Sequence, residues 1–251
     1  MNILITNDDG IFSPGIKILA DKFAEKHNVT VVAPKENKSA TGHALTIGRE
    51  LILKKEDISD KYPSWSMTGT PADCIKFAYH CFKDFKPDIV VSGINNGPNL
   101  ATDVVYSGTL SAAIEGVYLG LPSFAVSSTV YENNNFEQCA AVCYAVFEAI
   151  IKVDKMPAAY NINVPNGKIK GVKFAKLGIL TYHENYEKIK DDTFVLSGYV
   201  KDKKNNDKDC DVVVCEQGYA SVTPIIFNKT DYAAIENLKN MKLKTAHGII
   251  G

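Results

Sequence analysis

The first 130 residues alternate short runs of β-branched and apolar residues with segments whose apolar residues recur at helical spacing. The runs at 2–6 (NILIT) and 88–92 (DIVVS) each contain three consecutive aliphatic residues, which indicates strands buried on both faces. Residues 16–27 and 109–119 have helical patterns, and Thr70-Pro71-Ala72-Asp73 is a typical capped helix start. Residues 44–53 alternate loosely, which suits a strand pair or hairpin. Because parallel strands need crossover connections, this alternation predicts an α/β fold built on a parallel sheet.

After the long helical pattern at 136–153, the alternation of predicted strands and helices stops. Five runs predict strands with no helix between them: 158–163, 172–177, 193–200, 211–215 and 219–224. We therefore divide the chain into an α/β core over residues 1–180 and a β-rich arm over 181–251, in which residues 231–240 form a final helix. An arm of this kind is expected to pack against another subunit or to exchange with it.

Charge and cysteine usage exclude several classes of protein. The 28 Lys and Arg residues balance 29 Asp and Glu residues, so the surface is not basic enough for a binder of nucleic-acid duplexes. The longest apolar stretch, 140–151, carries Glu148 and is too short to span a membrane. The N-terminus lacks the pattern of a signal peptide, and the six cysteines lack zinc-site spacing. We expect a cytoplasmic protein with free thiols.

Two adjacent carboxylates, Asp8 and Asp9, follow the first predicted strand directly. In an open parallel sheet the ligand site lies outside the carboxyl ends of the strands, and this is such an end. Neighbouring carboxylates repel each other unless a cation neutralises them, and hard divalent ions prefer oxygen ligands. A solvated turn explains Asn7-Asp8-Asp9-Gly10 equally well from this segment alone.

Two further loops are expected at the same edge. The loop at 38–43 contains Ser39 and His43, and the loop at 92–99 contains Asn95. Each is explained by turn chemistry when taken alone, and a packed or capping role is favoured for His43 over a catalytic one. Together Asp8, Asp9, Ser39 and Asn95 supply an all-oxygen ligand set that suits Mg²⁺ or Mn²⁺.

The segment Tyr106-Ser107-Gly108-Thr109 precedes a predicted helix. Backbone amides at a helix N-terminus, with hydroxyls alongside, form a site for an anion such as phosphate, although a plain helix cap explains the segment as well. A G-x-x-x-x-G-K-[ST] loop and a G-x-G-x-x-G fingerprint are absent from the sequence, which argues against P-loop NTPases and dinucleotide-dependent oxidoreductases.

Seven motifs in one order resemble the SurE (survival protein E) family of metal-dependent nucleotidases. They are MNILITNDDG, KSATGHALT, GTPADC, SGINNGPN, YSGTLSAAIEG, NINVP and GYASVTP, and they extend from residue 1 to about 224. The resemblance implies a Rossmann-like, mostly parallel sheet in a three-layer αβα core, with a C-terminal β-rich extension that builds homodimers or homotetramers. It also implies hydrolysis of nucleoside 5′- and 3′-monophosphates, and in some members of short polyphosphate.

The resemblance also assigns residues. Asp8, Asp9, Ser39 and Asn95 fall on the family's ligands for one divalent metal ion per subunit, and Ser107, Gly108 and Thr109 fall where the family holds the phosphate. Asn96 is assigned to substrate binding with them. One segment departs from the pattern: residues 209–214 read DCDVVV where a Thr-Asp-x-x-Ala segment is expected.

The expected reaction is in-line attack of a water molecule on the phosphoryl group, with Asp8 and Asp9 as the catalytic carboxylates. The sequence does not decide which of the two accepts the proton of the water. A phosphatase that uses the first Asp as a nucleophile is a rival, but such enzymes usually separate their two acids by one residue. A regulatory module that binds nucleotide or metal without turnover is the rival outside the enzymes.

Overall fold

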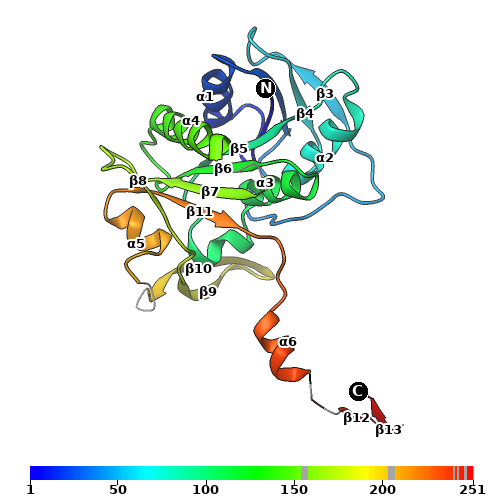
Figure 1. Ribbon diagram of the computed structural model, residues 1–251, viewed down its shortest axis with the longest axis vertical. Coiled ribbons are helices and arrows are strands. Elements are labelled where there is room, and N and C mark those ends of the chain that lie inside the picture. Colours follow the sequence, from blue (N-terminus) through cyan, green and yellow to red (C-terminus); the bar gives the residue numbers. More distant parts are fainter. Residues whose placement is uncertain (154–157, 203–206, 240, 242, 246–247, 251) are drawn as a thin grey trace.

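The protein is described by a computed structural model that covers residues 1–153, 158–202, 207–239, 241, 243–245 and 248–250. Its centre is a nine-stranded sheet with the strand order β3-β4-β2-β1-β5-β6-β7-β11-β8 (Figure 1). Six neighbouring strands run parallel: β4 (Ser64–Met67), β2 (Asn28–Pro34), β1 (Asn2–Thr6), β5 (Ile89–Asn96), β6 (Ser123–Ser128) and β7 (Ala159–Val164). The mostly parallel sheet predicted from the sequence is confirmed.

At both edges of the sheet the strands run opposite to the six central strands. At one edge β3 (Leu53–Glu56) pairs antiparallel with β4. At the other edge β11 (Ala220–Ile225) pairs antiparallel with β7, and β8 (Val172–Phe174) runs parallel to β11. The strand β11 lies within 181–251 in sequence but belongs to the central sheet in space. The chain therefore returns to the core after residue 180 before it leaves again.

Helices cover both faces of the sheet and complete the three layers (Figure 1). The helices α1 (Pro14–Ala24) and α4 (Phe136–Val153) pack together on one face, while α2 (Pro71–Cys81) and α3 (Gly108–Tyr118) pack together on the other. The first face buries aromatic rings, including Phe23, Phe124 and Phe147, and the second buries Leu4, Met67 and Ile75. A continuous core on each face fixes the sheet from which the loops of the site emerge.

The capped start predicted for the helix at residue 70 is confirmed as a capping box. The Thr70 hydroxyl accepts a hydrogen bond from the Asp73 amide at 3.2 Å, and the Asp73 carboxylate accepts one from the Thr70 amide at 2.8 Å. Two of the amides that a helix start leaves without intrahelical partners are satisfied in this way.

Two expectations for secondary structure were wrong. Residues 44–52 form a loop rather than a strand pair, and a strand begins only at Leu53. Residues 211–215 form the helix α5 (Asp211–Glu216) instead of a strand. Short β-branched runs do not distinguish a buried strand from a buried helix, and here tertiary contacts decide. Asp211 is fully buried, and its carboxylate accepts from the amides of Ala101, Gly178 and Val212.

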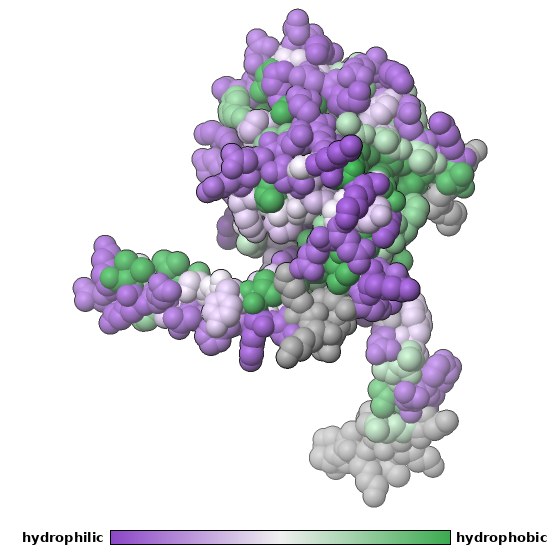
Figure 2. All heavy atoms as spheres, turned by 90° about the vertical axis from the view of Figure 1, so that its left-hand side faces the viewer, coloured by the Kyte–Doolittle hydropathy of each residue, from purple (hydrophilic) through white to green (hydrophobic). Residues whose placement is uncertain are grey.

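The hairpin of β9 (Thr181–Lys190) and β10 (Thr193–Asp202) forms a separate two-stranded sheet, and β9 was not expected from the sequence. The helix α6 (Tyr232–Leu238) is followed by the short strands β12 (Leu243–Thr245) and β13 (Gly248–Ile250). Figure 1 shows α6 and the C-terminal strands extending away from the body, and in Figure 2 two protrusions leave the body. The predicted end of the last helix at Asn240 lies outside the described residues.

Among the described residues, no helix combines the length and the apolar character that crossing a membrane requires.

Candidate active site

The site lies at the topological switch point of the sheet, between β1 and β5, where the order of the strands reverses. Strand β1 pairs with β2 on one side and with β5 on the other, so the connections leave β1 and β5 toward opposite halves of the sheet. In open parallel sheets a crevice forms at such a point, outside the carboxyl ends of the strands. Asp8 and Asp9 follow the end of β1, and Asn95 and Asn96 form the end of β5.

Asp8 is buried and is held by the start of α3. The Thr109 hydroxyl donates to Oδ1 of Asp8 at 2.5 Å, and the Thr109 amide donates to Oδ2 at 3.2 Å. Burial raises the pKa of Asp8 to about 6, and the charge of Asp9 adds to the rise, while the bonds from Thr109 oppose it. The surroundings thus destabilise the ionised form of Asp8, and a positive charge placed beside it would stabilise that form.

Asp9 is held by the strand that carries Asn95. Its Oδ2 accepts from the Asn96 amide at 3.0 Å, and burial raises its pKa. The Asn95 side chain donates its Nδ2 to the Gly97 carbonyl at 2.8 Å, which leaves its Oδ1 as an acceptor. These bonds bring the two carboxylates and the Asn95 amide to one rim of the sheet, as the sequence predicted.

Ser39 reaches the same rim through the loop that follows β2. The Lys38 amide donates to the Asp8 carbonyl at 2.7 Å, and the Ser39 amide donates to Oδ1 of Asn37 at 2.8 Å. Further along, the Gly42 amide donates to the Tyr106 carbonyl at 3.0 Å. The loop is therefore hydrogen-bonded to Asp8 on one side of Ser39 and to the residue before the N-cap of α3 on the other.

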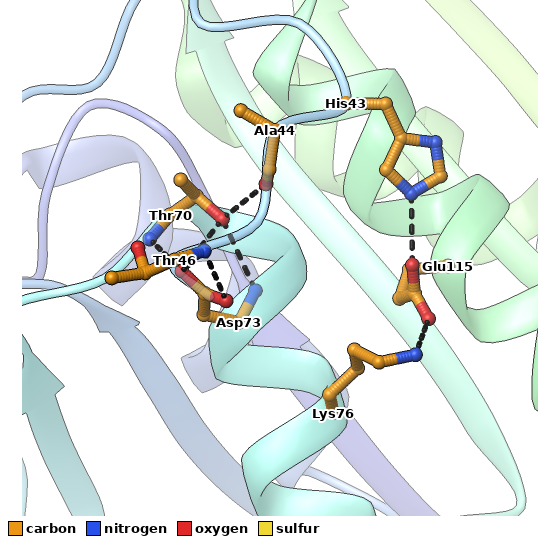
Figure 3. A network of polar contacts seen from close by, with 7 residues as sticks. All are labelled: His43, Ala44, Thr46, Thr70, Asp73, Lys76 and Glu115. Atoms are coloured by element: carbon orange, nitrogen blue, oxygen red, sulfur yellow. Dashed lines mark hydrogen bonds and ion pairs between the residues drawn. The ribbon is translucent and has the colours of Figure 1, made fainter. Parts of the chain in front are cut away.

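The far end of this loop is anchored on α2 and α3 (Figure 3). The Thr46 amide donates to Oδ1 of Asp73 at 3.1 Å, and the Thr70 hydroxyl donates to the Ala44 carbonyl at 2.7 Å. Nε2 of His43 lies 2.8 Å from Glu115, a buried residue of α3. These contacts agree with the packed role that the sequence favoured for His43.

Glu115 joins the loop to both helices because it also accepts from the Lys76 ammonium at 2.7 Å (Figure 3). Burial alone raises the pKa of a carboxyl group. At Glu115 the hydrogen bonds from His43 and Lys76 outweigh that effect and hold the pKa below its ordinary value. The residue is charged at neutral pH and fixes one end of the loop that carries Ser39.

The N-terminus of α3 completes the site. Ser107 is the N-cap, and its hydroxyl accepts from the Leu110 amide at 3.0 Å, so the hydroxyl proton remains free for another acceptor. Gly108 lies against Asp8: a Cβ at this position would stand 2.9 Å from Oδ2 of Asp8. Thr109, which the family resemblance assigns to phosphate binding, donates to Asp8 from both its hydroxyl and its amide.

A pocket of about 230 Å³ opens on this rim, and we call it the acidic pocket. Five of the predicted residues line it, namely Asp8, Ser39, Asn95, Asn96 and Ser107. Asp9, Gly108 and Thr109 do not line it and contact those that do. Its lining also includes residues that sequence reasoning missed: Pro98, Asn99, Asp103, Tyr106 and Tyr131. Asn99 and Tyr106 stood within the quoted motifs, whereas nothing in the pattern singled out Asp103 or Tyr131.

The donor set of the acidic pocket fits a hard divalent cation. In the described part of the chain no Lys, Arg or His forms an ion pair with Asp8 or Asp9. The same residues contain no group of three or more His, Cys, Asp or Glu side chains placed to hold a metal. A site here would therefore combine two carboxylates with neutral oxygens and waters, which is the ligand chemistry of Mg²⁺ or Mn²⁺.

The fold and the pocket define a Rossmann-like α/β protein with an oxygen-rich site at the switch point of its sheet. Comparison with known proteins assigns the family: the sequence profile of Survival protein SurE matches residues 3–184, and the chain belongs to the SurE family. A "5'-nucleotidase SurE" from Kosmotoga olearia is 41% identical over 249 residues, which are 95% of this chain and 97% of that protein.

Two further comparisons agree with this assignment. A "5'-nucleotidase SurE" from Pelotomaculum thermopropionicum is 41% identical over 251 residues, covering 98% of this chain and 96% of that protein. The crystal structure of the SurE protein from Aquifex aeolicus superposes with a TM-score of 0.81 at 36% identity, over 95% of this chain and 98% of that one. Both the sequence and the architecture are thus shared along nearly the whole length.

Proposed function

We propose that this chain is a phosphomonoesterase that hydrolyses nucleoside 5′-monophosphates to nucleoside and phosphate. Its relatives carry the name 5'-nucleotidase. The observation that supports the proposal most is the juxtaposition of Asp8, Asp9 and Asn95 beside the N-terminus of α3. A bound cation would stabilise the two carboxylates, and the start of α3 offers hydrogen-bond donors to an anion. This combination suits a phosphoryl group that is bound through a metal ion.

We assign Asp8, Asp9, Ser39 and Asn95 as the groups that would hold one divalent ion, Mg²⁺ or Mn²⁺, per subunit. Burial and mutual repulsion destabilise the two carboxylates, and no cationic side chain of the described residues compensates for this. When bound, such an ion supplies charge neutralisation for phosphoryl oxygens and lowers the pKa of a coordinated water.

The residues of the chain have separate tasks in this proposal. The Ser107 hydroxyl, the Gly108 amide and the Asn96 side chain bind phosphate oxygens at the start of α3, where the helix dipole favours an anion. Thr109 positions Asp8 through its two hydrogen bonds rather than touching the phosphate. Asp8 or Asp9 accepts the proton of the attacking water. Because Thr109 donates to both oxygens of Asp8, a water nucleophile is favoured over attack by Asp8 itself.

The resemblance to the family extends the proposal to nucleoside 3′-monophosphates and to short polyphosphate. It also predicts a homodimer or homotetramer built through the C-terminal extension. The hairpin exposes large apolar side chains, among them Phe194 and Leu196, and so does α6 with Tyr232 and Leu238. Exposed apolar surface on segments that project from the body supports an interface between subunits. Light scattering coupled to gel filtration measures the subunit count.

A cytoplasmic location, expected from the sequence, remains part of this proposal. It agrees with the six cysteines, which are all free thiols, five of them buried.

The test is a panel of nucleoside 5′- and 3′-monophosphates and tripolyphosphate, assayed with Mg²⁺, with Mn²⁺ and with excess EDTA. We expect metal-dependent release of phosphate, and the variant Asp8→Asn should lower turnover by orders of magnitude while its melting temperature stays high. Asp60→Asn, in an exposed loop, is the matched control. Turnover that survives both EDTA and Asp8→Asn contradicts the metal role, and a covalent phosphate adduct on Asp8 supports the nucleophile instead.

A further inference from the structure

A second cavity adjoins the acidic pocket. It has a volume of about 440 Å³ and lies between the hairpin, α5 and the loops that follow β5 and β6. Three residues, Pro98, Asp103 and Tyr131, line both cavities, so the aromatic side of one lies directly beside the acidic side of the other. We call it the aromatic cavity, because Tyr131, Tyr182 and Tyr199 line it.

Tyr131 stands at the junction of the two cavities and is fixed by the backbone beneath it. Its ring lies against Gly97, where a Cβ would stand 2.3 Å from the Cε1 atom of the ring. The loop that carries Tyr131 is also tied to the end of β5, because Nδ2 of Asn134 donates to Oδ1 of Asn96 at 2.7 Å and to the Tyr131 carbonyl at 3.3 Å. An aromatic face is thereby held next to a residue assigned to substrate binding.

Tyr182 is held on the hairpin side of the cavity. Its hydroxyl donates to both oxygens of Asp103, at 2.8 and 2.6 Å, and burial beside Asp103 raises the pKa of this hydroxyl, so it stays protonated. Nearby, the Thr102 hydroxyl donates to the Leu180 carbonyl at 2.9 Å. These bonds fix the base of the hairpin, and with it the ring of Tyr182, to the short 3₁₀ helix Ala101–Val105.

The chemistry of the lining selects the kind of group that would fit. Aliphatic side chains such as Leu100, Leu180 and Val212 accompany the tyrosines, and the two acidic residues in the lining are Asp103 and Glu216. Among the described residues that line the cavity there is no Lys, Arg or His. Additional phosphates would meet acidic groups and no cation there, whereas a flat, neutral ring would find apolar and aromatic surface.

We propose that the aromatic cavity is the subsite for the nucleobase of a nucleoside monophosphate, with Tyr131 and Tyr182 as aromatic walls that favour substrates carrying a base over phosphate esters without one. The inference rests on the proposed nucleotidase function and adds to it the group by which the substrate is recognised. With the phosphate at the start of α3, the sugar would pass Tyr131 and the base would enter the cavity. Stacking of a base on an aromatic side chain tolerates any base, because every base has a π-face.

The experiment compares adenosine 5′-monophosphate with ribose 5-phosphate, which carries the same phosphate and sugar without the base. Both are assayed on the metal-loaded full chain, and the readout is the ratio of their kcat/KM values. We expect the wild type to prefer the nucleotide, and Tyr131→Ala or Tyr182→Ala to reduce the ratio about 5- to 100-fold. Tyr131→Phe keeps the ring and should keep the ratio.

Tyr186→Ala is the matched control, because Tyr186 lies on the same hairpin but does not line the cavity. This variant should retain the wild-type ratio. An unchanged ratio in both Tyr131→Ala and Tyr182→Ala, or a wild type that hydrolyses both substrates equally well, overturns the nucleobase subsite while the phosphatase activity stands. A wild type that hydrolyses neither substrate overturns the proposed function, and the subsite with it.

Discussion

The hydroxyl of Thr109 donates a 2.5 Å hydrogen bond to the carboxylate of Asp8, across 101 residues of chain. This bond joins the loop after the first strand to the first turn of α3. The Thr109 amide adds a second bond to the other oxygen of the same carboxylate at 3.2 Å. The proposed metal ligand and the proposed phosphate site are therefore hydrogen-bonded to each other, so a change in the position of one affects the other.

We expect Thr109→Val to lower activity about 10- to 100-fold, since groups that orient a metal ligand have effects of this size. Valine has a similar shape but no hydroxyl, so Oδ1 of Asp8 loses its donor. Thr109→Ser keeps the hydroxyl and is the matched control. Steady-state rates at several metal concentrations measure the effect, and equal activity in the Val and Ser variants would contradict the positioning role.

The close approach of Gly108 to Asp8 predicts that even one methyl group is harmful there. In a helix, Gly→Ala ordinarily stabilises by about 0.5–1 kcal/mol. At Gly108 the new Cβ would stand 2.9 Å from both Cβ and Oδ2 of Asp8, so we expect a loss of activity together with about 1–3 kcal/mol of stability. Activity assays and urea unfolding measure the two effects.

The control for Gly108→Ala is Gly116→Ala, in the same helix but away from the pocket. Its Cβ would stand 2.3 Å from Oγ of Ser123 and 2.8 Å from Cγ2 of Val90. This variant should lose stability while each folded molecule keeps its turnover. A Gly108→Ala protein that is stabilised and fully active would show that Asp8 shifts without consequence.

Ser107 has two roles that two substitutions separate. Its hydroxyl caps α3 and, in the proposed function, donates its proton to the phosphate. Ser107→Ala should cost about 1 kcal/mol of stability, whereas Ser107→Gly should cost only a few tenths because glycine is tolerated at an N-cap. Both should lower kcat/KM about 10- to 100-fold, as expected for a lost hydrogen bond to a charged group. If kcat/KM followed the stability of each variant instead, the hydroxyl would act as a cap alone.

The buried carboxylate of Glu115 predicts an acid-dependent loss of stability. Its pKa in the folded state is lowered from 4.5, so between the two pKa values the unfolded chain binds more protons and stability rises with pH. The contribution is complete above the unfolded pKa and is lost as the pH falls through the folded one. Glu115→Gln should therefore be less stable than wild type by about 1.5–3 kcal/mol at pH 7, and the difference should shrink below about pH 4.5.

Urea unfolding between pH 3 and pH 7 measures this difference for Glu115→Gln. The control is Glu25→Gln, which removes an exposed i,i+3 pair with Lys22 and should cost less than about 1 kcal/mol. A Glu115 deficit that did not change with pH would assign the effect to packing rather than to charge.

Much of the site could be predicted because it is local in sequence. Asp8, Asp9 and Asn95 each stand at the end of an apolar run, and the rule that parallel strands end at one edge places them together. The helix start at Thr70 could be predicted for the same reason, since a capping box involves residues only three apart. The helix α5 and the strand β9 could not, because a short apolar run and an exposed hairpin carry weak local signals.

Local sequence patterns predicted most strands and helices of the α/β core and the oxygen-bearing side chains at the ends of its strands, because periodicity and turn chemistry are properties of neighbouring residues. They did not indicate β4, and they favoured a strand pair at 44–53 where the structure has a loop over 44–52. Contacts between distant segments place Thr109 on Asp8 instead of in the pocket, and they bring Asp103, Tyr131 and Tyr182 to one cavity beside it. Those relationships join segments dozens of residues apart. They depend on how helices and hairpin pack on the sheet, which no local pattern encodes.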